Sequence, residues 1–117
     1  MYTVIFITVG DGQEAASIAR ALVEERLAAC VNILGGVHSI FRWGGRVDEA
    51  EEILLIVKSS DALLEDIVKR VKDLHGYSNP EIVALPVIGG SGDYLDWVTS
   101  SLEGQGESNG KKDLSCP

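Results

Sequence analysis

Cysteine, proline, histidine and aromatic residues are all scarce in this chain of 117 residues, which has 2 Cys, 3 Pro and 2 His and is 6% aromatic. Two cysteines are too few for a disulfide-stabilised scaffold, and one of them, Cys116, is the penultimate residue. We therefore expect Cys30 and Cys116 to be thiols in a reducing cytoplasm. The sequence has no C-x-x-C or H-x-x-x-H spacing, so spacing alone predicts no zinc site.

Basic residues are also few, with 10 Lys and Arg against 18 Asp and Glu, a formal net charge of −8. This balance argues against a nucleic-acid partner, which needs clustered positive charge, and against anionic membranes. The chain has no apolar run near the roughly 20 residues of a membrane span. Its first residues lack the basic start of a signal peptide. We expect a soluble cytoplasmic protein with no nucleic-acid or membrane partner.

Hydrophobic residues, by contrast, make up 45% of the chain, enough for the core of one domain. Their periodicity predicts strands, and helices that begin at Asp11, Ser59–Asp61 and Ser91. The expected strands are 2–9, 30–43 with a kink at Gly35-Gly36, a return strand ending in 53–57, and 81–87. The order βαββαβ plus a terminal helix predicts an α+β, ferredoxin-like sandwich over residues 1–103. Residues 104–117 are polar and predict a disordered tail.

The helix ends carry finer expectations. Asp11 and Glu14 form a capping-box-like start for the first helix, which should run to about Ala28. The second helix should bury a face that includes Ile67 and Val71. The last helix should bury one face, formed by Tyr94, Leu95, Val98 and Leu102.

The central hairpin is unusually long. Gly44-Gly45 is typical of a tight turn, and each arm runs about a dozen residues, roughly twice the usual strand length. Its outer part, with Phe41 and Trp43, should extend past the helices that cover the sheet. An uncovered apolar ribbon with open edges is an aggregation liability. A neighbouring subunit is the simplest cover, so we predict a homo-oligomer.

Several candidate sites have simpler structural explanations. The segment 10–15 matches G-x-G-x-x-A, but Asp11 and Glu14 would repel a pyrophosphate, so it indicates a tight turn rather than a dinucleotide site. The acidic run at 48–52 is typical of a solvated edge. Lys58 and Glu81 could form an ion pair, hold a polar ligand or simply reach water. No nucleophile–base or paired-carboxylate spacing is present, so we expect no enzyme.

The metal-capable side chains are Cys30, His38 and His75, with Cys116 in the tail. Cys30 lies at the start of a strand, where cysteine is commonly a small core residue. His38 should face solvent or an interface. His75 ends a helix, where a histidine complements the helix dipole. Each of these interpretations competes with a role as a metal ligand.

Five separated segments resemble the CutA divalent-cation tolerance family, over residues 2 to about 102. They are Glu25–Ile33, Ser39–Gly45, Glu52 with Lys58, His75–Ile82 and Tyr94–Trp97. The resemblance implies a ferredoxin-like homotrimer of the PII type, in which long hairpins extend around neighbouring subunits. It also implies a cytoplasmic, non-enzymatic protein of metal tolerance that binds a divalent metal ion, with copper as the candidate.

The resemblance also suggests site residues. The copper site of one branch of the family aligns with Ile7, Leu74 and His75, so only His75 retains a ligating side chain. Cys30 matches the family pattern, which leaves Cys30 and His75 as the candidate metal ligands. Six residues form a pocket-like cluster that is similar across the family: Asn32, Ser39, Trp43, Lys58, Tyr77 and Glu81. They support an alternative function, a PII-like signalling or scaffold trimer that binds a small ligand at the inter-subunit cleft.

Overall fold

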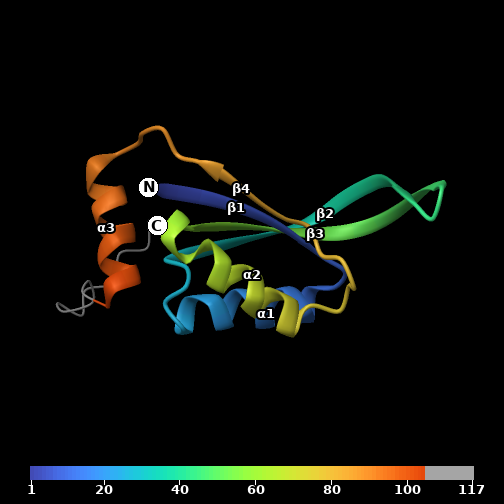
Figure 1. Cartoon of the computed structure of the whole chain (residues 1–117), viewed down its shortest axis with the longest axis horizontal. Coiled ribbons are helices and arrows are strands. Elements are labelled where there is room, and N and C mark those ends of the chain that lie inside the picture. The colour runs from blue at the N-terminus through green and yellow to red at the C-terminus, as the bar shows by residue number, and fades with distance from the viewer. Residues whose placement is uncertain (105–117) are drawn as a thin grey trace.

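The computed structural model describes residues 1–104, which form an antiparallel sheet of four strands with helices on one face and at one end (Figure 1). The elements are β1 (Tyr2–Val9), α1 (Gly12–Glu24), β2 (Cys30–Trp43), β3 (Arg46–Ser60), a 3-10 helix η1 (Asp61–Leu63), α2 (Leu64–Leu74), β4 (Ile82–Pro86) and α3 (Gly92–Glu103). This order confirms the predicted ferredoxin-like α+β arrangement. The predicted tail, with Cys116, lies almost entirely outside the described residues.

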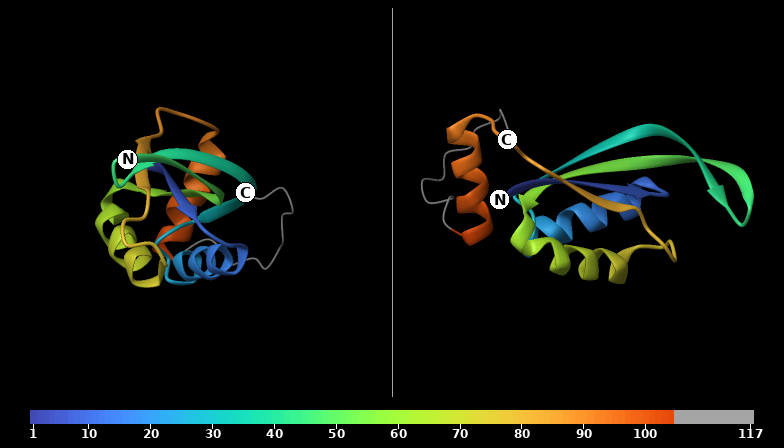
Figure 2. Two further views of the ribbon diagram at one scale, coloured as in Figure 1. Left: turned by 90° about the vertical axis from the view of Figure 1, so that its right-hand side faces the viewer. Right: turned by 45° about the horizontal axis from the view of Figure 1, so that its top comes forward.

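The core lies between the sheet and the two helices α1 and α2 (Figure 2). The strand order is β2-β3-β1-β4, so β1 is flanked on both sides. Alternate side chains of β1 point to the helices, and Ile5, Ile7 and Val9 are fully buried. The helices contribute the facing side chains, such as Ile18 and Ile67. Burying each such side chain stabilises the fold by about 1.5–3 kcal/mol.

The first helix begins as predicted but ends earlier. The Asp11 side chain accepts a hydrogen bond from the Glu14 backbone N–H at 2.8 Å, which caps the helix. The helix stops at Glu24 rather than near Ala28, because Arg26 adopts a left-handed φ of 59°. The capping-box expectation for the Glu14 carboxylate is wrong, since that carboxylate contacts the loop after α2 instead.

The other helices also differ in detail from expectation. The Ser60 side chain caps the 3-10 turn, so α2 itself begins at Leu64. The Ser91 cap of α3 is confirmed by a hydrogen bond from the Tyr94 N–H. Of the four residues expected on the inner face of α3, only Val98 is buried. None of the helices within residues 1–104 is both long and apolar enough to cross a bilayer.

The long hairpin extends well past the helices, as the sequence predicted (Figure 1). Pairing of β1 with β3 ends at Val9 and Ile53, so residues 37–52, here called the outer hairpin, pair only with each other. The Gly44-Gly45 turn has φ values of 60° and 78°, which favour glycine. Trp43 is 57% exposed. One chain therefore leaves an apolar ribbon uncovered.

The face of the sheet opposite α1 and α2, here called the open face, is also apolar. It carries Val4 and Phe6 of β1 together with their β4 partners Leu85 and Val83. Leu85 is 44% exposed, and Val83 is 49% exposed. Exposed apolar surface of this kind is typical of an interaction site. Cover by further copies of the chain stays a prediction.

Candidate functional site

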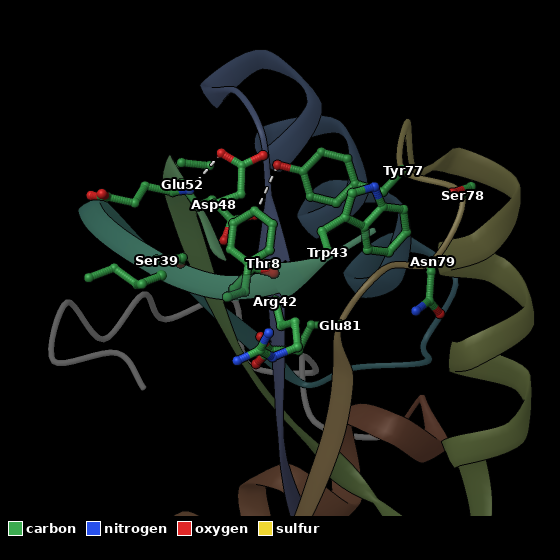
Figure 3. Close-up of a pocket in the computed structure, with 14 residues that line it drawn as sticks. Thr8, Ser39, Arg42, Trp43, Asp48, Glu52, Tyr77, Ser78, Asn79 and Glu81 are labelled. Carbon is green, nitrogen blue, oxygen red and sulfur yellow. Dashed lines mark hydrogen bonds between the residues drawn. The ribbon is translucent and has the colours of Figure 1, made fainter. Parts of the chain in front are cut away.

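A pocket of about 750 Å³ lies between the outer hairpin and the loop at residues 75–81, here called the 75–81 loop (Figure 3). Its volume is in the range of small-molecule sites. Four of the candidate residues line it: Ser39, Trp43, Tyr77 and Glu81. The hairpin and the loop are far apart in sequence, so the fold brings these residues together.

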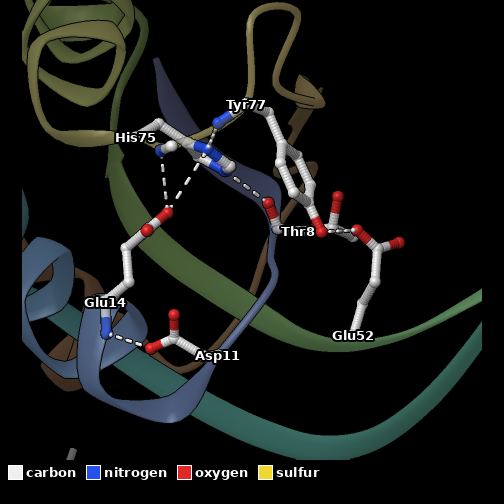
Figure 4. A network of polar contacts seen from close by, with 7 residues as sticks. Thr8, Asp11, Glu14, Glu52, His75 and Tyr77 are labelled. Atoms are coloured by element: carbon white, nitrogen blue, oxygen red, sulfur yellow. Dashed lines mark hydrogen bonds and ion pairs between the residues drawn. The ribbon is translucent and has the colours of Figure 1, made fainter.

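His75 fixes the start of the 75–81 loop. Its side chain is 0% exposed. Its Nε2 lies 2.7 Å from the Thr8 carbonyl oxygen, and its Nδ1 accepts the Tyr77 backbone N–H at 3.0 Å. These partners assign the neutral tautomer with the proton on Nε2, which donates to Thr8. Both ring nitrogens are therefore used inside the fold (Figure 4).

Glu14 ties the same loop to α1. Its carboxylate accepts the Gly76 backbone N–H at 2.9 Å and lies 3.5 Å from His75 Nδ1. A Cβ at Gly76 would lie 3.0 Å from the Glu14 Oε2, so a larger residue there would displace the carboxylate. The 75–81 loop is thus held by β1 on one side and by the first turn of α1 on the other.

Tyr77 joins the loop to the hairpin. Its hydroxyl donates to Glu52 Oε2 at 2.9 Å. Burial, followed by this hydrogen bond and the nearby negative charges, raises the pKa of Tyr77 to about 12. The hydroxyl therefore stays protonated and remains a donor. A Cβ at Gly10 would lie 3.1 Å from this oxygen, so a larger residue there would require a small shift of the tyrosine.

Asn32 and Lys58 form a second group away from the pocket. The Lys58 ammonium donates to Asn32 Oδ1 and lies 3.9 Å from the Cys30 sulfur. Lys58 is six residues from Glu52 along β3, a distance of about 20 Å at the usual strand rise. The six candidate ligand-binding residues thus divide into four at the pocket and two elsewhere. Lys58 contacts Asn32, not Glu81 as one of our alternatives had it.

Cys30 and His75 are not brought together within one chain. Cys30 pairs with Lys58, and Lys58 pairs with Val4, near the start of β1. His75 contacts Thr8, four residues further along β1, which is about 13 Å away. Two ligands of one ion need to lie within about 4 Å of each other, since metal–ligand bonds are about 2.0–2.3 Å. Cys30 is a buried thiol.

The positions aligned with the copper site likewise do not fit a metal. Ile7 is fully buried in the core, and Leu74 packs against that core. His75 would have to give up a hydrogen bond to bind an ion. Among residues 1–104, no three His, Cys, Asp or Glu side chains are placed to hold a metal together. A single chain therefore does not provide a copper site from these residues.

The sequence reasoning missed a histidine cluster on the outer hairpin. His38 Nδ1 lies 2.7 Å from Glu51, and Nε2 lies 2.6 Å from Glu49. The hydrogen bond with Glu51, then that with Glu49, raises the pKa of His38 above its ordinary value. The Gly44-Gly45 turn fixes His38 opposite Glu51, so counting back from the turn could have found this pair. The contacts of Glu14 with His75 and Gly76 could not be found in this way, because these residues lie more than 60 positions further along the chain.

Known proteins resemble this chain over most of its length. The CutA tolerance protein of Thermus thermophilus is 53% identical over 84% of this chain and 95% of its own. The chloroplastic CutA of Arabidopsis thaliana is 42% identical over 84% of this chain, which spans 54% of that longer protein. The structure of the periplasmic divalent cation tolerance protein CutA from Archaeoglobus fulgidus has a TM-score of 0.85 and 37% identity, covering 87% of this chain and 99% of that one.

A match to a protein family covers the same part of the chain as these relatives. Residues 3–101 match the family described as CutA1 divalent ion tolerance protein, which is nearly all of the described structure. The fold, the hairpin and the motifs at 25–33, 39–45 and 75–82 all fall within this match. The chain belongs to the CutA1 divalent ion tolerance family.

Proposed function

We propose that this chain acts in divalent-cation tolerance as a cytoplasmic, homotrimeric protein that works by binding and not by enzymatic catalysis. The family membership supports the tolerance role. The observation that carries the binding role is the pocket of about 750 Å³, where four candidate residues from two distant segments converge. The same pocket supports the PII-like alternative, in which ligand binding at a cleft near a neighbouring subunit serves signalling or scaffolding.

A growth assay tests the tolerance role. A strain that lacks the gene is challenged with excess copper, zinc and other divalent ions, then complemented with the wild type or with Trp43→Ala. We expect the deletion to sensitise growth, the wild type to restore it, and the pocket variant to restore it less well. A deletion strain that tolerates every ion tested as well as its parent would contradict the proposal.

The homotrimer is supported by the uncovered open face and the outer hairpin. Light scattering should give three times the chain mass of 12.5 kDa. Leu85→Lys puts a charge on the open face and should dissociate the trimer. Val23→Lys is the matched control, since Val23 is 42% exposed, much like Leu85, but lies on α1. A monodisperse wild-type monomer would contradict the assembly.

Direct metal binding is the second candidate, because the family description names divalent ions. Copper or zinc can be titrated into the wild type, Cys30→Ala and His75→Asn. Because Cys30 and His75 lie too far apart within one chain to share an ion, we expect the same number of bound ions in all three proteins. Loss of the same ion in both variants would instead indicate a site that Cys30 and His75 share between copies.

The cytoplasmic location rests on the expected reduced thiols. The names of relatives include a chloroplastic and a periplasmic protein. Cell fractionation with cytoplasmic and envelope markers tests the location directly, and recovery in the envelope fraction would contradict it.

A further inference from the structure

We propose that the pocket binds a small organic cation, one with an ammonium or guanidinium group on a short apolar chain. This inference rests on the proposed function, which makes the pocket the binding site, and it names the class of ligand. Three features of the pocket support it: the sign of its charge, its aromatic side chains and the spread of its carboxylates.

The charge of the pocket favours a cation. Four carboxylates and one guanidinium line it. One carboxylate, that of Glu49, contacts the His38 ring, and the other three still outnumber the single guanidinium. Glu81 is exposed and makes no hydrogen bond or ion pair within residues 1–104, so its carboxylate is available to a ligand. The Glu52 carboxylate accepts from Tyr77 through one oxygen, which leaves the other for a second donor. An anionic ligand would meet repulsion here.

The aromatic side chains favour an organic cation in particular. The chain is only 6% aromatic, yet Phe41, Trp43 and Tyr77 all line this one pocket. Figure 3 shows Trp43 from the hairpin next to Tyr77 from the 75–81 loop, whose hydroxyl points to the acidic Glu52. The faces of aromatic rings attract ammonium and guanidinium groups and also cover apolar carbon chains. Trp43 is 57% exposed in the single chain, so the chain itself leaves part of the ring uncovered. Because a neighbouring copy is also expected to contact the outer hairpin, binding is tested on the assembled protein.

The arrangement of the carboxylates does not fit a bare metal ion. A hard divalent ion takes six or more oxygen ligands at one point. Within residues 1–104 the acidic side chains do not converge in this way. Dispersed carboxylates around aromatic rings instead match a ligand whose charges are separated by methylene groups.

The test uses Trp43 as the reporter. The chain has two tryptophans, so Trp97→Phe leaves Trp43 alone to report on the pocket. Spermidine and agmatine are titrated into the assembled protein, with glutarate as the anionic control and Mg²⁺ as the bare cation. Calorimetry on the wild-type protein checks that the Trp97→Phe background behaves in the same way. A capped Gly-Arg-Gly peptide distinguishes a free small molecule from an arginine side chain of another protein.

We expect a saturable change in Trp43 fluorescence with spermidine or agmatine and none with glutarate or Mg²⁺. Glu81→Gln and, by calorimetry, Trp43→Ala should each weaken binding roughly three- to thirtyfold, the range of one desolvated cation–π or charge contact. Glu65→Gln removes the same charge outside the pocket and should change affinity less than about twofold. If the peptide binds more tightly than agmatine, the pocket still recognises an organic cation. The natural ligand would then be an arginine side chain of another protein.

Two outcomes would overturn the inference. One is no saturable response to any organic cation in a protein that remains assembled. The other is Mg²⁺ binding as tight as that of spermidine with the same loss in Glu81→Gln, which would make the pocket a site for bare cations. Neither outcome changes the result expected in the growth assay or the oligomeric mass. Failure of the organic-cation proposal is therefore distinguishable from failure of the proposed function.

Discussion

Replacement of His75 separates a structural histidine from a metal ligand. The ring donates to the Thr8 carbonyl at 2.7 Å and accepts from the Tyr77 N–H at 3.0 Å, with no exposed side-chain surface. His75→Leu leaves both buried groups without partners. Each such group costs about 1–3 kcal/mol, so we expect the free energy of unfolding to fall by roughly 2–5 kcal/mol once the burial of leucine is allowed for.

Two further variants divide this loss. The amide of His75→Asn can replace the acceptor at Nδ1 but does not reach Thr8, whereas His75→Gln can place a donor near Nε2 and loses the acceptor. Each should cost about 1–3 kcal/mol, less than the leucine variant. Urea unfolding of the assembled protein, at one fixed protein concentration, measures these differences. The exposed His38→Asn is the matched control and should change stability less.

The result that would refute this reasoning is specific. If His75→Leu unfolds at the same urea concentration as the wild type, the ring does not hold the 75–81 loop. If, in addition, copper titration shows one ion lost in every His75 variant, the residue is a ligand in the assembled protein. We expect the opposite combination, a loss of stability with an unchanged number of bound ions.

Two titrations test the remaining electrostatic features. NMR should show His38 with a pKa above its ordinary 6.5, and Glu51→Gln should lower it. Because the folded pKa is raised, the His38 contacts stabilise the hairpin below the ordinary pKa and lose that effect as pH rises through the folded value. The absorbance of tyrosinate, assigned with Tyr77→Phe, should give a pKa of about 12, and Glu52→Gln should lower it only partly because burial is the larger cause.

The features that the sequence predicts well are local ones. The Asp11 cap and the Gly44-Gly45 turn depend on residues within a few positions of each other, and both are confirmed. The order of strands and helices follows from periodicity and is also confirmed. The predicted helix end near Ala28 is wrong because the backbone turns left-handed at Arg26, a change that the surrounding apolar pattern does not signal.

The site is harder to predict, because its contacts join distant segments. Glu14 is placed correctly for a capping box, yet the N–H of Gly76 lies close enough to take its carboxylate, at a sequence separation of 62 residues. Asn32 and Lys58 belong to the same six-residue cluster that the family resemblance suggested, but they lie on a different part of β2 and β3 from the pocket residues. The family resemblance identifies the candidate residues, but the strand register determines which of them lie close together in one site.

That register depends on one extra residue in β2. Leu34 pairs with Leu54, but Val37 pairs with Glu52, so β2 has two intervening residues where β3 has one. Gly36 makes this bulge possible, because its φ of 76° favours glycine. Beyond the bulge the side chains of β2 exchange faces, since the period of a strand is two.

The exchange decides which side chains the outer hairpin presents to the 75–81 loop. With the bulge, Phe41 and Trp43 lie on the face of β3 that carries Glu52, whose carboxylate accepts from the loop. If the same residues of β2 paired regularly, without the bulge, His38 and Arg42 would lie on that face in place of Phe41 and Trp43. The aromatic character of the pocket thus depends on the bulge at Gly35-Gly36, although neither glycine lines the pocket.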